Sequence, residues 1–112
     1  MEESVAELSL RARSAERGDF AIHVQIGRPV RSDRAPWACP MAINGLLRTL
    51  SPAYGEDSMQ ALCLAIWFVA QQLYDFVQNG GRLWYSGGDP NNDFPLEAYF
   101  RPLLPPQGKG AA

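Results

Sequence analysis

A chain of 112 residues is long enough to bury one hydrophobic core and too short for a catalytic domain joined to a regulatory one. Its hydrophobic fraction of 46% and charged fraction of 20% are ordinary for a globular protein, which argues against wholesale disorder and against a membrane protein. A net charge of -2 provides no general positive field, so nucleic acid is not an expected partner.

Three stretches of alternating apolar and polar residues predict antiparallel strands. The first is Ala6–Ala12 and the second is Phe20–Ile26, and turn residues at Glu16–Asp19 between them predict a hairpin. The third stretch, Trp37–Ile43, contains Pro40. Because proline has no N–H to donate to a neighbouring strand, we expect this third strand at a sheet edge.

The stretch Asn44–Glu56 contains glycine and proline and is predicted to be a connection, with a short turn around Leu46–Leu50 that seals the core. A helix follows with signals at both ends. Asp57 can cap its first turn, Gln60 stands three residues later as in a capping box, and Asn79 with two glycines ends it. Helical spacing places one apolar face on the sheet, comprising Met59, Leu62, Cys63, Ile66, Val69, Ala70, Leu73, Phe76 and Val77.

After the helix, Arg82–Ser86 predicts a short fourth strand, and the glycine- and asparagine-rich stretch Gly87–Asp93 predicts a mobile loop. Phe94–Leu104 is apolar enough to dock on the rest of the protein. Pro95 and Pro102 prevent it from forming one long regular element.

These elements predict an α+β fold: an antiparallel three-stranded meander, one long amphipathic helix packed on one face, and a short fourth strand, in the order β-β-β-α-β. The long connection before the helix leaves the place of the fourth strand in the sheet open. We expect a single domain over residues 1–104 and a disordered tail over residues 105–112.

The cysteines and the absence of targeting signals predict a cytoplasmic protein. Cys39 and Cys63 are the only thiols, and we expect both to be free and packed, with Cys63 acting as a small hydrophobe in the helix. Met1–Ser4 does not begin a secretory signal. The longest apolar run, Ala61–Ala70, is about half of the ~20 residues that a membrane helix needs, so no membrane partner is expected.

Three motifs carry a resemblance to a known family: Ile26–Pro29 reads Ile-Gly-x-Pro, Trp37–Cys39 reads Trp-x-Cys, and Gly55–Leu62 reads Gly-x-Asp-x-x-Gln-Ala-Leu. Over Phe20–Ser86 the chain resembles a family of small uncharacterised bacterial domains. Cys63 departs from the glutamine of that family. The resemblance implies the fold and a bacterial origin, but no activity and no catalytic residues.

A first candidate site lies on the open face of the predicted sheet. His23 is the only histidine, and with Gln25, Arg11, Arg13 and Trp84 it could line the ligand patch of a small enzyme or ligand-binding domain. The alternative is an exposed histidine on a solvated sheet face, which we favour. A single histidine cannot form a multi-histidine metal site, and no nucleophile motif accompanies it, so neither metal nor cofactor is expected.

The loop Asp89–Asp93 has oxygen ligands at the first, third and fifth positions of a calcium loop. Phe94 replaces the required glycine, and Phe100 replaces the closing carboxylate. We therefore expect a solvated turn there and no metal site.

A second candidate site lies on the back of the helix, where Leu64, Phe68 and Gln71 face away from the predicted sheet side. Phe94–Leu104 could fold over these residues, which we favour, or they could bind a second copy or another protein. The leading hypothesis for function is a non-enzymatic protein-interaction module of immunity or accessory type. It depends mainly on the absence of catalytic motifs, and the small enzyme around His23 is the alternative.

Overall fold

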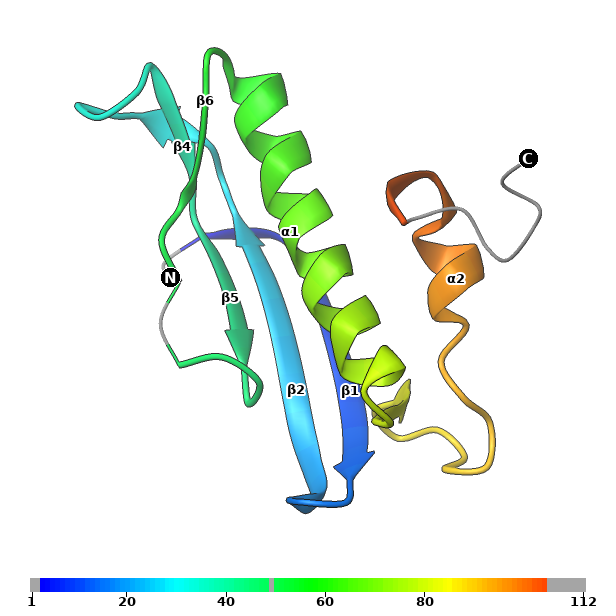
Figure 1. Ribbon diagram of the computed structural model, residues 1–112. Helices are drawn as coiled ribbons and strands as arrows, with labels where there is room; N and C mark the ends of the chain where they lie inside the picture. The colour runs from blue at the N-terminus through cyan, green and yellow to red at the C-terminus, as the bar shows by residue number, and fades with distance from the viewer. Residues whose placement is uncertain (1–2, 49, 105–112) are drawn as a thin grey trace.

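The computed structural model describes residues 3–48 and 50–104, so the predicted tail, residues 105–112, lies outside the described residues. Within them, antiparallel strands and one long helix form an α+β fold, as predicted (Figure 1). The helix lies along one face of the main sheet, and a smaller sheet lies beside its N-terminal end. The core therefore sits between the helix and the two sheets.

The main sheet contains four strands in the order β5-β2-β1-β7, and every neighbouring pair is antiparallel. These strands are β1 (Ser4–Ser14), β2 (Gly18–Gly27), β5 (Met41–Asn44) and β7 (Arg82–Tyr85). The predicted meander is confirmed as β1, β2 and β5. The place of the fourth strand, which the sequence left open, is beside β1.

The β1–β2 hairpin sets which side chains share a face of the sheet. Gly18 takes a φ of 70°, a conformation that glycine adopts without strain, and closes the turn after β1. The register then pairs Leu10 with Ile22 on the face toward the helix, and Ser9 with His23 on the outer face. Leu10 and Ile22 are each 1% exposed, so the inner face is dry.

The predicted third strand divides at Pro40 into two strands that belong to different sheets. β4 (Trp37–Cys39) joins β3 (Val30–Arg31) and β6 (Ala53–Gly55) in a three-stranded sheet, whereas β5 pairs with β2. Pro40 cannot donate a hydrogen bond, but its carbonyl accepts one from Gly27 N at 2.8 Å. β5 is an edge strand, so the expected edge position is confirmed for the residues after Pro40. For Trp37–Cys39 it is wrong, because β4 is the central strand of the smaller sheet.

Strand β6 was not predicted, because its three residues are too few for an alternating pattern and follow Pro52. The leucines of the same connection do seal the core, as expected. Leu46 and Leu50 are half-buried against the core cluster.

Helix α1 (Ser58–Gln78) begins at the predicted cap. The Asp57 side chain accepts a hydrogen bond from Gln60 N at 2.7 Å, which satisfies an amide that has no partner within the first turn. The Gln60 side chain reaches back to accept from Glu56 N at 2.7 Å, one residue earlier than a standard capping box.

The C-terminal end of α1 is a Schellman motif. Gly80 N donates to Val77 O at 3.0 Å, and Gly81 N donates to Phe76 O at 2.9 Å. Gly80 has a φ of 99°, which favours glycine at this position. The predicted helix limits are therefore confirmed.

The buried stripe of α1 differs in part from the predicted face. Buried residues are Ala61, Ala65, Val69, Ala70 and Leu73. Met59 and Cys63 were predicted in the core, and this was wrong: Met59 is 69% exposed, and Cys63 is also exposed. The reason is close packing at the start of the helix, where a Cβ on Gly55 would lie 2.5 Å from Ala61 N. The helix turns its small alanines toward this contact, and Met59 and Cys63 turn outward.

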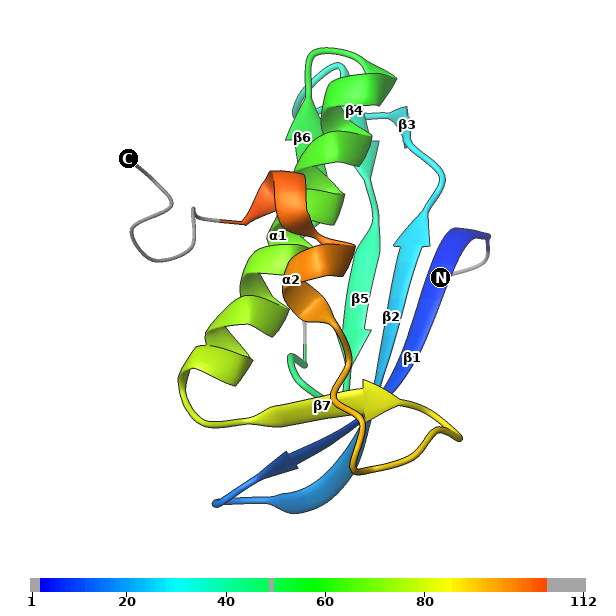
Figure 2. The same cartoon turned by 90° about the vertical axis from the view of Figure 1, so that its right-hand side faces the viewer.

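The C-terminal segment docks on the rest of the protein through aromatic and leucine side chains. Phe94 N donates to Leu83 O at 2.8 Å, and then the short helices α2 (Leu96–Tyr99) and η1 (Arg101–Leu103) follow. Phe94, Leu96 and Phe100 are all buried. In Figure 2 the segment with α2 passes in front of α1, and η1 contacts α1. The expected docking and the absence of one long element are both confirmed.

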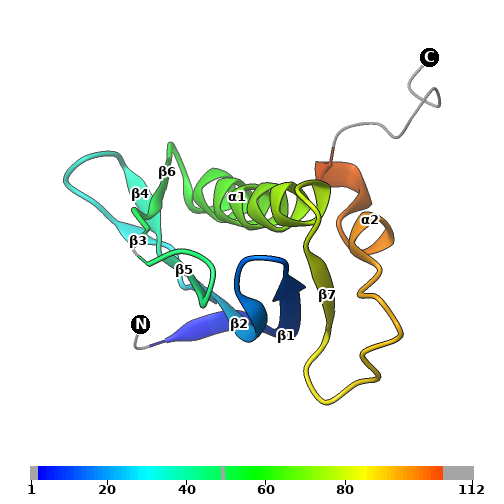
Figure 3. The ribbon, with the colours of Figure 1, turned by 60° about the horizontal axis from the view of Figure 1, so that its bottom comes forward.

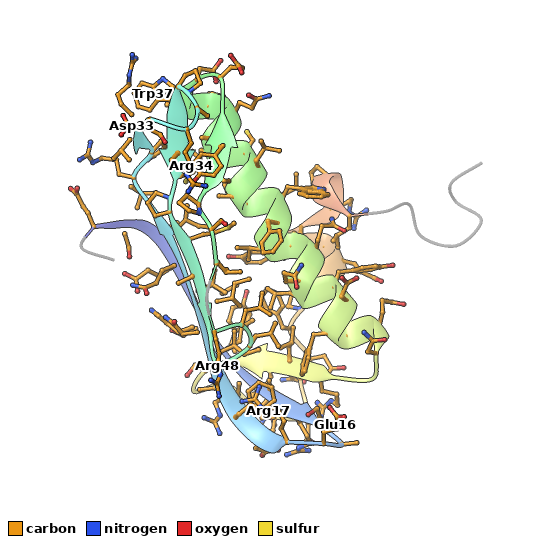
Figure 4. All side chains as sticks on the ribbon, turned by 60° about the vertical axis from the view of Figure 1, so that its left-hand side comes forward. Glu16, Arg17, Asp33, Arg34, Trp37 and Arg48 are labelled. Carbon is orange, nitrogen blue, oxygen red and sulfur yellow. The ribbon has the colours of Figure 1, made fainter. Side chains whose placement is uncertain are left out.

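The arrangement along α1 places different features at its two ends. In Figure 3, β1 and β2 lie under α1, with the small sheet toward its N-terminal end and α2 toward its C-terminal end. In Figure 4, Asp33, Arg34 and Trp37 mark the end with the small sheet, and Glu16, Arg17 and Arg48 mark the end with the hairpin.

By length and composition alone, the 21 residues of α1 could cross a membrane. Core helices of soluble proteins meet the same criteria. In this structure 28% of that apolar stretch is buried, along the stripe from Ala61 to Leu73.

Candidate functional site

The fold brings most of the predicted ligand patch onto the outer face of the main sheet. His23 pairs with Ser9 of β1 and Asn44 of β5, and Gln25 follows it on the same face. Arg11 lies farther along β1, opposite Trp84 of β7. Among the residues that the structure describes, no hydrogen bond or ion pair joins His23 to Arg11, so the patch consists of two separate groups.

The first group is a hydrogen-bonded chain centred on His23. Ser9 Oγ lies 2.9 Å from His23 Nδ1, and Glu7 Oε1 lies 2.8 Å from His23 Nε2. The tautomer with its proton on Nε2 fits both bonds, because it donates to the carboxylate and accepts from the hydroxyl. Serine, histidine and carboxylate in this order have the connectivity of a nucleophile, a base and an orienting acid.

The surroundings of this chain are those of a solvated surface. The His23 side chain is 39% exposed and the Glu7 side chain is 51% exposed. Gln25 is tied to its neighbours, donating to Ser4 Oγ at 3.1 Å and accepting from Asn44 at 3.3 Å. Gln25 and Asn44, the neighbours of His23, line a groove of about 600 Å³, but His23 itself does not line it. The face is therefore built of paired polar groups around an open histidine.

The second group is centred on Trp84, which is 4% exposed. The guanidinium carbons of Arg13 and Arg82 lie 5.2 and 5.5 Å from the centroid of its ring, and so cover the indole. A ligand on this face cannot reach Trp84 as the side chains stand. The predicted ligand patch therefore loses Trp84 and retains Arg11 at its margin.

The arginines that cover Trp84 are themselves paired. Two hydrogen bonds from Arg13, at 2.5 and 3.1 Å, lower the pKa of the Asp19 carboxyl, and the same pair raises the pKa of Arg13. Arg82 bonds Asp93 Oδ1 through Nε at 3.0 Å and Nη2 at 2.5 Å. The charges of Arg13 and Arg82 are thus already paired with carboxylates, so they are not available to bind an anionic ligand.

The contact with Arg82 also explains the loop that partly resembles a calcium site. Asp93, the fifth position of that pattern, is held by arginine, and Asp89 accepts from Asn91 N at 2.9 Å in a local turn. No group of three or more potential metal-ligating side chains occurs within residues 3–48 and 50–104.

The back of α1 is covered in a different way from the one predicted. Gln71 donates to Leu103 O at 2.7 Å, so η1 does fold over this position. Leu64 instead faces the connection before β6 and is 39% exposed, and Phe68 beside it is half-buried against the core. The segment Phe94–Leu104 therefore covers Gln71 and leaves Leu64 in contact with solvent.

Leu64, Trp67 and Phe68 form one wall of an apolar groove of about 320 Å³. The opposite wall comes from Met41 and from the connection Leu50–Tyr54. Trp67 is 46% exposed at the edge of this groove. The groove is open to water, and the side chains that line it are predominantly aliphatic and aromatic.

Sequence reasoning missed the extent of this surface. Met59, Cys63 and Trp67 stand four residues apart and follow one line of the helix, and Leu64 lies beside them. We call Met59, Cys63, Leu64 and Trp67 the outer strip. All four residues are recognisably apolar in the sequence. Met59 and Cys63 were assigned to the core because their helical spacing is compatible both with the buried face of the helix and with the exposed face next to it.

The two thiols differ in their surroundings. Cys39 is 0% exposed, its Sγ donates to Gly27 O at 3.3 Å, and burial raises its pKa. Cys63 lies on the outer strip and is exposed. Both thiols are free, as expected, but the expected packing holds only for Cys39.

Comparison with known proteins places the chain in a family without assigning it an activity. No curated protein and no solved structure matches it. A family model described as a domain of unknown function matches residues 7–96, from β1 to the first residue of α2. That span includes His23, the groove beside Leu64 and all of the outer strip. The chain therefore belongs to the family DUF6968, a family of domains of unknown function.

Proposed function

We propose that this protein is a non-enzymatic interaction module that binds a protein partner through the outer strip of α1 and the adjoining groove. The observation that carries this proposal is the exposure of Met59, Leu64 and Trp67, three large apolar side chains within nine residues of one helix. A contiguous apolar patch of this kind on a small protein is typical of a surface that a partner covers.

The composition of the surface suits a protein–protein contact. Tryptophan and methionine are enriched in interfaces, and an indole that projects from a helix beside a groove is a common anchor for binding energy. Polar side chains border the strip on the same helix, with Gln60 beside Met59 and Gln71 one turn beyond Trp67, as expected at the rim of an interface. Covering the strip would remove its apolar area from water at ~25 cal/mol per Å².

The rest of the proposal concerns the setting. Two free thiols and a net charge of -2 fit a cytoplasmic protein of bacteria that acts as an accessory or immunity-type partner and not on nucleic acid. The proposed partner is a different protein. Association between two copies is the competing arrangement that the test below separates.

The test compares Trp67→Glu with Tyr85→Glu. Trp67 is 46% exposed and Tyr85 is 44% exposed, but only Trp67 belongs to the outer strip. A second pair is Leu64→Glu and Val30→Glu, at 39% and 38% exposure. Each variant is checked by circular dichroism and light scattering, and tagged proteins are then expressed in the native host and purified with bound partners.

We expect a stoichiometric partner with the wild type, Tyr85→Glu and Val30→Glu, and its loss with Trp67→Glu and Leu64→Glu. The proposal fails if all five proteins purify with the same components. It also fails in its heteromeric form if light scattering shows a wild-type dimer that Trp67→Glu converts into a monomer.

A second candidate function is favoured by one observation, the chain Ser9–His23–Glu7. In this alternative, the domain is a small hydrolase in which His23 removes the proton from Ser9 Oγ and Glu7 holds the imidazole. It ranks second because these three side chains lie on an exposed polar face, and the groove that the neighbouring Gln25 and Asn44 line includes none of the three.

The hydrolase alternative is tested with p-nitrophenyl acetate as the substrate. It requires turnover by the wild type above the buffer rate, with loss of that turnover in Ser9→Ala and in His23→Gln. Ser86→Ala is the control, because Ser86 is not one of the hydrogen-bonded residues Ser9, His23 and Glu7. Equal rates in the wild type and Ser9→Ala would remove this candidate.

A further inference from the structure

A second binding feature lies on the opposite edge of the main sheet from β5, where β1 extends beyond its neighbour. Strand β1 runs from Ser4 to Ser14, but β7 pairs with it only over Leu10–Arg13. One further bond joins Ser86 N to Ser9 O at 3.2 Å. Toward the N-terminus from Ser9, β1 therefore has β2 on one side, and no strand within residues 3–48 and 50–104 pairs with its other side (Figure 2).

The register identifies the backbone groups on this open edge. Ser9 directs its carbonyl toward β7, and residues two apart along a strand point their N–H and C=O to the same side. Glu7 therefore presents one donor and one acceptor at the open edge, whereas Leu8 pairs with Val24 in β2. An incoming strand with one residue opposite Glu7 could form both hydrogen bonds of an antiparallel pair.

An apolar groove adjoins this edge. Its volume is about 170 Å³, and its lining includes Ala6 and Leu8 of β1, Ile66 of α1, and Tyr99 and Phe100 of the C-terminal segment. The groove opens where the inner side chains of β1 pass beyond the cover of β7. Proteins that bind an extended peptide as an added strand use both features. Backbone hydrogen bonds to the sheet edge supply affinity, and pockets for alternate side chains of the peptide supply specificity.

We propose that the open edge of β1 binds an extended peptide segment of another protein by strand addition, with the pattern apolar–basic–apolar. The residue opposite Glu7 shares the outer face with the Glu7 carboxylate, so a lysine or arginine is favoured there. Its two neighbours point to the other face and enter the groove beside Leu8 and Ile66. This site uses residues distinct from the outer strip, and it stands even if Trp67→Glu has no effect.

The charge of Glu7 also decides between a peptide and a second copy. Two β1 edges paired about Glu7 would place two carboxylates directly opposite each other, which destabilises a sheet pair. A segment with a basic residue at that place converts the same position into an attractive contact. The structure thus favours a segment of another protein over a copy of this chain.

The test uses a displayed library of random peptides selected on the wild type. Glu7→Pro removes the outward N–H without removing a bond to β2, because proline is tolerated where the N–H faces away from the neighbouring strand. Glu7→Gln keeps the N–H and removes the charge. Ala6→Glu keeps the backbone and places a carboxylate in the groove, at a residue that is exposed in the free protein.

We expect selected peptides to share the apolar–basic–apolar pattern, to lose at least about tenfold in affinity for Glu7→Pro and Ala6→Glu, and to bind Glu7→Gln more weakly than the wild type. Binding should also slow hydrogen exchange at the Glu7 amide, which we expect to exchange faster than the Leu8 amide in the free protein. All three variants are first checked for native hydrogen exchange in β2, so that loss of binding is not mistaken for loss of fold.

Several results would overturn the proposal. A selection that yields no peptide, or only peptides that bind the wild type, Glu7→Pro and Ala6→Glu equally, means that the edge is not a binding site. A Glu7 amide as protected as that of Leu8 in the free protein would mean that the edge is already paired. A wild-type dimer abolished by Glu7→Pro would assign the edge to a second copy.

Discussion

Two long sides of α1 are apolar, but one is buried in the protein and the other is exposed to solvent. The inner side, from Ala61 through Ala65 and Val69 to Leu73, is buried against the sheets. The outer strip, from Met59 to Trp67, faces water beside an open groove. Because the helix packs on the core through its inner side and the half-buried residues beside it, the fold does not require large apolar residues on the outer strip. This difference is why we assign the outer strip to a partner.

Among the variants that test this comparison, Leu73→Ala should have the largest effect on stability. Leu73 is 0% exposed, and its truncation should lower the free energy of unfolding by about 2–5 kcal/mol, from lost burial and from the cavity that remains. Urea unfolding followed by circular dichroism measures the change. A loss below about 1 kcal/mol would show that the inner side is less closely packed than the structure indicates.

A smaller effect is expected at the start of the helix, where Asp57 holds the turn that presents Met59 outward. Asp57→Ala removes the acceptor for Gln60 N and should cost about 1 kcal/mol of unfolding free energy. Asp57→Asn retains an acceptor and should stay close to the wild type. Equal losses in both variants would mean that the charge of Asp57, and not the capping bond, stabilises the helix.

The buried thiol and the exposed thiol should contribute differently to the pH dependence of stability. Burial raises the pKa of Cys39 above its unfolded value of about 8.5, so folding favours the neutral thiol. The stability that this group contributes is fully present below the unfolded pKa and is lost as pH rises through the folded pKa. We expect the alkaline loss of stability to be smaller in Cys39→Ala and unchanged in Cys63→Ala, measured by urea unfolding between neutral and alkaline pH.

The same thiols differ in their accessibility at neutral pH. Cys63 should react with iodoacetamide in the folded protein, and Cys39 should react only after opening of the core. Mass spectrometry of the labelled peptides distinguishes them. Simultaneous labelling of both thiols in the native protein would contradict the burial of β4 under α1.

The smallest effect is expected on the outer strip itself. Met59→Gln exchanges two residues of similar helix propensity at an exposed position, so the free energy of unfolding should change by no more than about 0.5 kcal/mol. Thermal unfolding of the protein alone measures this change. A loss of several kcal/mol would place Met59 in the fold and weaken the comparison between the two sides of α1.

The candidate sites show where sequence reasoning reached its limit. Alternation placed His23 and Gln25 on the outer face correctly, because side-chain direction in a strand follows from a period of two. It did not bring Ser9 and Glu7 to His23, although both lie on the same face of the predicted hairpin. Their contact depends on the register, which the turn at Gly18 sets.

Local chemistry, by itself, determined the limits of α1, the β1–β2 hairpin and the edge position after Pro40, because caps, turns and proline act within a few residues. Tertiary structure decided which side of α1 is buried. The apolar residues of the helix exceed one face, and the close contact between Gly55 and Ala61 selects the side that meets the sheets. It also decided that β7 stops short along β1, which leaves Glu7 at an open edge, because strand pairing depends on residues far apart in the chain.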